Sequence, residues 1–175
     1  MVNILPYEHA KESRQVYERA HLALALSAYK KTSYKKAFEI LEQSKKWPEN
    51  IGVGKPFDPD ERAQDYLMAL TLDKLGNTEK AQNILDSIVG YTEDHMTLNT
   101  VNHLFGLLAT EKRQGKEAGN QLASELAEAT DKNNKRSRMA LNLHQTGADQ
   151  STKTDVASAM SKEIYDLSLW AIKSK

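Results

Sequence analysis

The chain has 175 residues with 24 basic and 24 acidic side chains, and it contains no cysteine. The balanced charge argues against a general nucleic-acid-binding protein, and the absence of cysteine excludes disulfides and thiolate zinc sites. Glycine and proline are scarce, which favours helices over β-sandwiches and barrels, and no segment approaches the roughly 18 apolar residues of a membrane span. We therefore expect a soluble helical protein that binds neither nucleic acid nor membrane.

The first two expected helices cover residues 8–31 and the segment after Ser33, which is a favourable N-cap residue. Pro48 should end the second helix near Trp47, because proline disfavours the helical conformation of the residue before it. Small and apolar positions follow the helical period in both segments. They are Val16, Ala20, Ala23, Leu24 and Ser27 in the first, and Tyr34, Ala37, Phe38 and Leu41 in the second.

The segment WPENIGVGKPFDPDER, residues 47–62, contains three of the four prolines. Its GVGK fails as a phosphate-binding loop, because Glu49 stands where the first glycine is needed and Pro56 follows Lys55. In DPDE, Asp58 could cap a new helix, with Pro59 at its first position and Glu61 reaching back to the cap. We expect residues 47–59 to form an ordered inserted loop, packed through apolar residues that include Trp47, Ile51, Val53 and Phe57.

The remaining elements are also predicted to be helical. A helix after residue 59 is apolar on two faces and ends at the Leu75-Gly76-Asn77 turn, and the next carries a stripe from Ala81 to Val89. Residues 95–113 and 116–130 indicate two helices joined by a turn at Gly115, followed by helices over 135–143 and 154–173. The fold class is therefore all-α, with seven or eight helices in antiparallel pairs.

Helix pairs that recur along a chain suggest an internal repeat. The segments YKKTSYKKAFEILEQSKKWP and LDKLGNTEKAQNILDSIVGY align Ala37 with Ala81 and Leu41 with Leu85, 44 positions apart. This spacing is a 34-residue unit with ten inserted residues. Gly76 occupies the turn of the second unit, and Thr32 takes that place in the first.

The pattern resembles the tetratricopeptide repeat, although the tryptophan usual in the first helix of that repeat is missing. The resemblance implies a short α-solenoid, in which antiparallel helix pairs stack into a right-handed superhelix. We place the repeat units at about 14–48, 60–93 and 95–130, and we interpret 135–175 as a degenerate unit or a capping helix.

The run LPYE, followed by YKKAFEILEQSKKWPENIGVGKPFDPDERAQDYLMALTLDKLG, resembles the C-terminal helical-repeat region of large bacterial, Bacteroides-like proteins. Those proteins carry a β-sandwich domain of unknown function before their repeats and occur among carbohydrate-handling proteins. The resemblance implies that the chain is a fragment of a longer protein. We expect a cytoplasmic location, with the periplasm as the alternative if a targeting signal preceded the fragment.

The chemical patterns indicate no catalytic, metal or cofactor site. No histidine pair has the spacing of a zinc-binding HExxH motif, and His95 and His103 would lie about 12 Å apart along one helix. No Ser, His and Asp arrangement includes a recognisable nucleophile turn. We therefore expect a non-enzyme that requires no cofactor.

What remains is the concave surface that stacked first helices form, which commonly binds peptides. The repeat resemblance implies that this surface presents Ser27, Lys30, Arg62, Tyr66, Asn99 and His103. The leading hypothesis is a module that binds a protein or peptide, or docks on an upstream domain of its own chain. The alternative is an accessory region of a carbohydrate-active enzyme, with loop contacts at Trp47 and Asp58 and a further carboxylate at Asp60.

Overall fold

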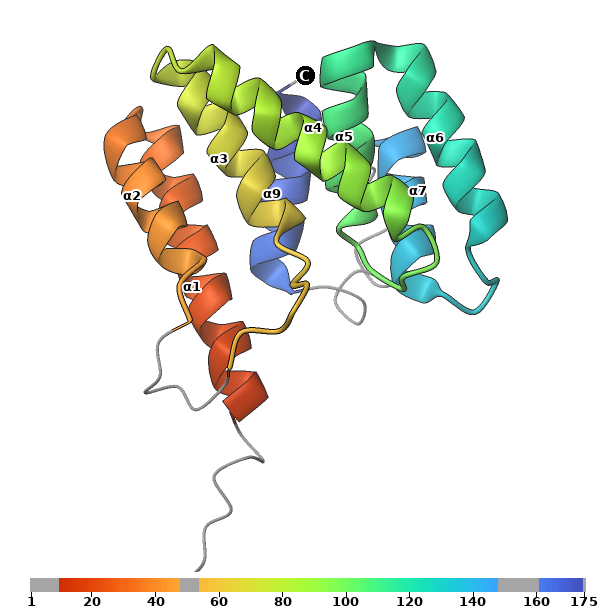
Figure 1. Ribbon diagram of the computed structural model, residues 1–175, viewed down its shortest axis with the longest axis horizontal. Helices are drawn as coiled ribbons and strands as arrows, with labels where there is room; N and C mark the ends of the chain where they lie inside the picture. Colours follow the sequence, from red (N-terminus) through yellow and green to blue (C-terminus); the bar gives the residue numbers. More distant parts are fainter. Residues whose placement is uncertain (1–9, 48–53, 148–160, 175) are drawn as a thin grey trace, which may run out of the picture.

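The computed structural model describes residues 10–47, 54–147 and 161–174, and over these ranges the chain forms eight α-helices and no strand (Figure 1). The expected all-α fold class is therefore confirmed. The helices are α1 (Ala10–Lys30), α2 (Tyr34–Ser44), α3 (Arg62–Lys74), α4 (Thr78–Asp94), α5 (His103–Gln114), α6 (Lys116–Ala129), α7 (Lys135–Thr146) and α9 (Lys162–Lys173). None of these helices has the length and apolar character needed to cross a membrane.

Successive helices form three packed pairs, α1 with α2, α3 with α4, and α5 with α6, and each pair packs on the next along the row (Figure 1). Helix α7 packs against α5 and α6 at one end of the row. Helix α9, the last in the chain, returns to contact α1 and α5. The result is a row of helix pairs with α9 packed against one side of it.

The first two pairs share one turn geometry. The residue at the centre of each turn has positive φ, 58° at Thr32 and 80° at Gly76. In the first turn the amide of Ser33 donates to the carbonyl of Ala28 at 3.0 Å, and the equivalent bond in the second turn measures 2.9 Å. These hydrogen bonds satisfy carbonyls at the end of the preceding helix, as in a Schellman motif.

The second helix of each pair approaches its partner through a small residue in its first turn. Ala37 and Ala81 are buried there, as the repeat alignment predicts. Gly119 takes the equivalent place in α6, and its amide donates to the residue before the helix, as those of Ala37 and Ala81 do. The third pair therefore repeats the packing of the first two with glycine in place of alanine.

Two helix starts differ from the sequence prediction. Helix α3 begins at Arg62, so Asp58 and Pro59 lie before it and do not form its cap. Asp60 engages the first helical residue instead, because its carboxylate accepts hydrogen bonds from the backbone and side chain of Arg62. Helix α5 begins at His103, and residues 95–102 form a connector where the sequence predicts helix.

Helix α1 turns a different face to the core from the one that its small residues suggest. Its buried apolar positions include Leu22, Ala25 and Leu26, whereas Val16 and Leu24 are among the exposed large hydrophobic residues. Both faces of α1 carry small and apolar residues, so the period alone does not identify the buried one.

One large apolar core joins residues from α1, α2, α3, α4, α5, α7 and α9. A smaller cluster lies between α5, α6 and α7, and it includes Leu107, Leu122 and Leu126. The C-terminal helix α9 therefore shares the main core with the first pair.

Candidate functional site: the face of the first helices

Helix α9 lies on the face that the first helices of the pairs present. Of the six helices in the pairs, it makes its main contacts with α1 and α5, both of which are first helices. In Figure 1 it runs behind α3, in the space between α1 and α5. In a helical repeat, the face that the first helices line is the one that commonly receives a partner.

The contact side of α9 follows the helical period. Leu167, Ser168 and Ala171 are buried, and Ile164 is partly buried against the same core. The positions 164, 167, 168 and 171 form one stripe of an amphipathic helix. The N-terminus of α9 is capped by Ser161, whose hydroxyl accepts from the amide of Ile164 at 3.4 Å.

Two specific contacts fix α9 against α1. The rings of Tyr29 and Trp170 meet edge to face, with 4.9 Å between their centroids. Near the other end, Arg19 Nε donates to Glu163 Oε2 at 2.8 Å. The hydrogen bond from Arg19 lowers the pKa of the Glu163 carboxyl. The position of α9 is thus set by an aromatic contact, an ion pair and a buried apolar stripe.

The six residues expected on the concave surface separate into two groups. Ser27 and Lys30 are exposed on α1, and Asn99 is exposed on the connector, where its side-chain oxygen accepts from the amide of Arg136. Arg62, Tyr66 and His103 are buried. The latter three therefore offer almost no surface to a partner in this conformation.

Arg62 is 2% exposed and lies at the centre of a buried polar cluster at the start of α3. Its guanidinium forms a two-point ion pair with Asp60, with distances of 2.8 Å from Nε to Oδ1 and 2.9 Å from Nη2 to Oδ2. Nη1 donates to Thr92 Oγ1 at 2.9 Å, and the guanidinium carbon lies 5.1 Å from the centre of the Tyr91 ring. These contacts meet the requirement that a buried charge be paired and hydrogen-bonded.

His103 joins this cluster in its neutral form. Arg62 Nη1 lies 3.2 Å from His103 Nδ1, and Leu98 O lies 2.8 Å from His103 Nε2. Arginine only donates, so Nδ1 accepts and Nε2 carries the proton that is donated to Leu98. Burial, together with the Arg62 charge, lowers the pKa of His103 to about 4.

Asp60 links the cluster to the connector before α5. Burial by itself raises the pKa of its carboxyl, but the hydrogen bonds and charge of Arg62 hold the pKa below its ordinary value. Thr100 Oγ1 donates to Asp60 Oδ2 at 3.2 Å. The cluster therefore ties α3 to residues 95–102, and this role is structural.

The loop contacts predicted at Trp47 and Asp58 are both engaged within the chain. The guanidinium of Arg14 lies 4.0 Å from the centre of the Trp47 ring and donates to the carbonyls of Ser44 and Lys46. Asp58 Oδ2 lies 2.9 Å from His95 Nε2. One face of the Trp47 ring is thus covered by a cation.

The packing predicted for the inserted loop is only partly described. The sequence predicts that Phe57 helps to pack the loop, but Phe57 is fully exposed and does not do so. Ile51 and Val53 lie outside the described residues.

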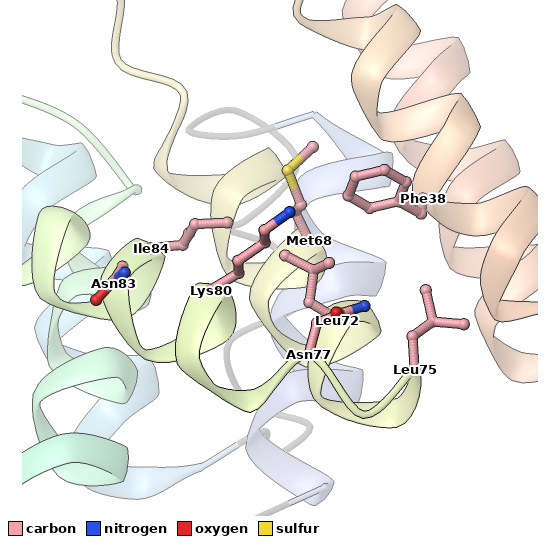
Figure 2. Close-up of a pocket in the computed structure, with 8 residues that line it drawn as sticks. All are labelled: Phe38, Met68, Leu72, Leu75, Asn77, Lys80, Asn83 and Ile84. Atoms are coloured by element: carbon pink, nitrogen blue, oxygen red, sulfur yellow. The ribbon is translucent and has the colours of Figure 1, made fainter.

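A shallow pocket of about 450 Å³ lies between α2, α3 and α4 (Figure 2). Its apolar wall is formed by Phe38, Met68, Leu72, Leu75 and Ile84, and Asn77, Lys80 and Asn83 complete its lining. Figure 1 shows α9 behind α3, and in Figure 2 the labelled pocket residues lie in front of the α9 ribbon. The lining contains neither carboxylate nor imidazole, so it offers no general acid or base of those kinds.

The carboxylate and imidazole side chains of residues 10–47, 54–147 and 161–174 do not assemble into a metal site. No group of three or more His, Asp or Glu side chains in these ranges could hold a metal ion. The buried histidine described above is committed to arginine and a backbone carbonyl, which removes its ring nitrogens from such a role.

The sequence predicts the last helix, over 154–173, but not the place where it docks. The stripe at Ile164, Leu167 and Ala171 signals an amphipathic helix, whereas its docking on α1 depends on contacts more than 100 residues apart, such as Arg19 with Glu163. Comparisons with protein-family models, curated proteins and solved structures find no match to this chain.

Proposed function

We propose that the chain is a non-catalytic interaction module of the tetratricopeptide-repeat type, which binds an amphipathic helix of a protein partner on the face now held by α9. The observation that carries this proposal is the docked helix itself. Its buried stripe and its contacts with Tyr29 and Arg19 are those of a helix-in-groove complex, formed here within one chain.

The chemistry of this face defines the expected partner. An aromatic residue in the partner helix would replace Trp170 against Tyr29, and an acidic residue near its N-terminus would replace Glu163 against Arg19. Between them, small or aliphatic residues would take the places of Leu167 and Ala171. The partner must compete with α9, so its apparent affinity depends on how often α9 leaves the face.

A labelled peptide of residues 161–174 tests this proposal on the full chain. The wild-type chain should bind it weakly, because the tethered α9 competes at an effective concentration of roughly millimolar. Leu167→Asp in the chain places a charge in a buried site and should loosen α9, which we expect to tighten peptide binding by about tenfold or more. Fluorescence anisotropy measures the dissociation constant.

Lys162→Ala provides the matched control, because Lys162 is an exposed residue of α9 that pairs with Asp166 and does not face the groove. It should leave peptide binding at the wild-type level. Circular dichroism checks that the helices of the Leu167→Asp chain remain folded. A folded Leu167→Asp chain that binds the peptide no better than wild type would contradict the proposal.

The alternative function, a sugar site built on residues 47–60, has weaker support. A sugar would have to stack on Trp47, one face of which is covered by Arg14, and would have to compete with Arg62 for the Asp60 carboxylate. Loss of glycan binding in Trp47→Ala with the fold intact would favour this alternative over the helix-binding proposal.

A further inference from the structure

The outward side of α1 carries an exposed apolar row. Val16 is 62% exposed and Leu24 is 58% exposed, and the exposed Ala20 lies between them at helical spacing. Ala23 and Ser27 flank this row and are also exposed. We call these five residues the α1 outer face. The other exposed large hydrophobic residues of the described ranges, Phe57 and Leu98, lie on connectors.

The internal repeat shows what this face is suited to do. The 44-residue spacing that relates the Thr32 and Gly76 turns also relates α1 to α3. It pairs Ala20, Ala23, Leu24 and Ser27 with Gln64, Leu67, Met68 and Thr71. All four positions in α3 are buried.

The difference between the two faces arises from their neighbours. Helix α3 packs against both helices of the preceding pair, α1 and α2. Helix α1 has no such pair before it within the described residues. The α1 outer face therefore has the position and the apolar character of a helix-packing surface, and in a single copy of the chain it faces solvent.

We propose that the α1 outer face is an interface between two copies of this chain, with the two α1 helices packed antiparallel. A two-fold axis beside Ala20 places Val16 of one copy opposite Leu24 of the other, so the row is complementary to itself. Ala20 and Ala23 permit a close approach of the two backbones.

The charges on α1 favour the antiparallel arrangement. Lys30 and Lys31 are exposed at its C-terminal end, so a parallel pair would bring four ammonium groups together. The antiparallel pair places them at opposite ends of the interface. A contact through one helix from each copy falls in the small class of interfaces, below about 1,200 Å² in total, and we therefore expect a reversible dimer of micromolar affinity.

Sedimentation velocity of the full chain from about 1 to 200 μM tests the proposal, since this range brackets a micromolar dissociation constant. The wild-type chain should shift from monomer to dimer across the range. Ala20→Glu should leave it monomeric, because two carboxylates would meet at the axis. Ala127→Glu is the matched control, because it makes the same change at an exposed alanine of α6 and should dimerise like wild type.

Because the chain contains no cysteine, single-cysteine variants give a second readout. Ala20→Cys should form a disulfide-linked dimer under mild oxidation, and Ala127→Cys should not. A wild-type chain that stays monomeric at every concentration overturns the proposal. A dimer that persists in Ala20→Glu, or equal cross-linking at the two cysteines, overturns it as well. None of these results depends on whether α9 or a partner helix occupies the face described in the proposed function.

Discussion

At the scale of single residues, the polar cluster around Arg62 fixes how three helices, α3, α4 and α5, meet. The guanidinium engages Asp60 before α3, Thr92 at the end of α4 and His103 at the start of α5. Removing one partner would leave a buried charge without compensation, which typically costs about 3–5 kcal/mol. The cluster therefore makes the junction of α3, α4 and α5 specific and intolerant of substitution.

His103 should make folding stability depend on pH between about 6.5 and 4. Its pKa is lowered from 6.5 to about 4 in the folded chain, so the unfolded chain binds the proton first as the pH falls. Stability contributed by the neutral ring is complete above pH 6.5 and is lost on acidification towards pH 4, by about 3 kcal/mol at most. Urea unfolding at pH 7 and pH 4.5 measures this loss.

His103→Gln should flatten this pH dependence, although it should also lower stability at pH 7. The control is His21→Gln, since His21 lies on α1 and is only partly buried. An unchanged pH dependence in His103→Gln would show that the titrating group is a different one.

The turns at Thr32 and Gly76 predict opposite effects for introducing and for removing a glycine. Thr32→Gly should stabilise the chain by about 1 kcal/mol, because threonine is strained at φ 58° and glycine is not. Gly76→Ala should destabilise it by about the same amount, since φ is 80° there. The shift of the urea midpoint measures both, and equal signs for the two substitutions would contradict the shared turn geometry.

At the scale of elements, the sequence is informative wherever a helix ends in a recognisable turn and buries one stripe. The turn at Gly76 and the close approach at Ala37 and Ala81 could be predicted because the residue types themselves require those conformations. The third pair departs from the pattern of the first two. Its turn is shortened to Gly115, and its small residue is Gly119 and not an alanine.

Other features depend on packing that leaves no local trace. Residues 95–102 contain neither glycine nor proline, so their pattern indicates helix, yet the connector is held by distant hydrogen bonds such as Ser137 Oγ to Leu98 O at 2.7 Å. The burial of Arg62 is a second such feature, because arginine is rarely buried without a partner. Its burial becomes predictable only once Asp60, Thr92 and His103 are known to surround it.

The approach of α4 to α5 depends on Gly106. A Cβ at this position would lie 2.8 Å from Thr92 Cβ, which is closer than real side chains come. Gly106→Ala should therefore destabilise the chain by about 1–3 kcal/mol, in spite of the better helix propensity of alanine. Thermal or urea unfolding by circular dichroism measures the change.

Gly90 provides the matched control for this substitution. It also lies within a helix, α4, but a Cβ there would meet no atom within 4 Å. Gly90→Ala should stabilise the chain by up to about 1 kcal/mol through helix propensity alone. Similar effects at the two glycines would contradict the close packing of α4 on α5.

At the scale of the whole molecule, α9 shares the main core with α1, although the two helices lie at opposite ends of the sequence. The proposed function requires α9 to leave this core while the other helices stay folded. Leu167→Ala should cost about 2–4 kcal/mol, because Leu167 is fully buried in that core. We expect this cost to fall first on the docking of α9.

Two probes of urea unfolding test this expectation. Far-UV circular dichroism follows all the helices, and fluorescence in a Trp47→Phe background follows Trp170 against Tyr29. In that background the fluorescence transition should precede the circular dichroism transition, and Leu167→Ala should move it to lower urea. Coincident transitions in both chains would contradict a separate release of α9.

Helix α9 belongs to the same chain as the groove that it fills. The face that α9 occupies and the α1 outer face should therefore respond differently to dilution. Docking of α9 is unimolecular, so its extent does not change with the amount of protein present. The proposed pairing of α1 helices is bimolecular and weakens as the protein is diluted. Dilution would therefore separate the paired α1 helices while leaving the docking of α9 unchanged.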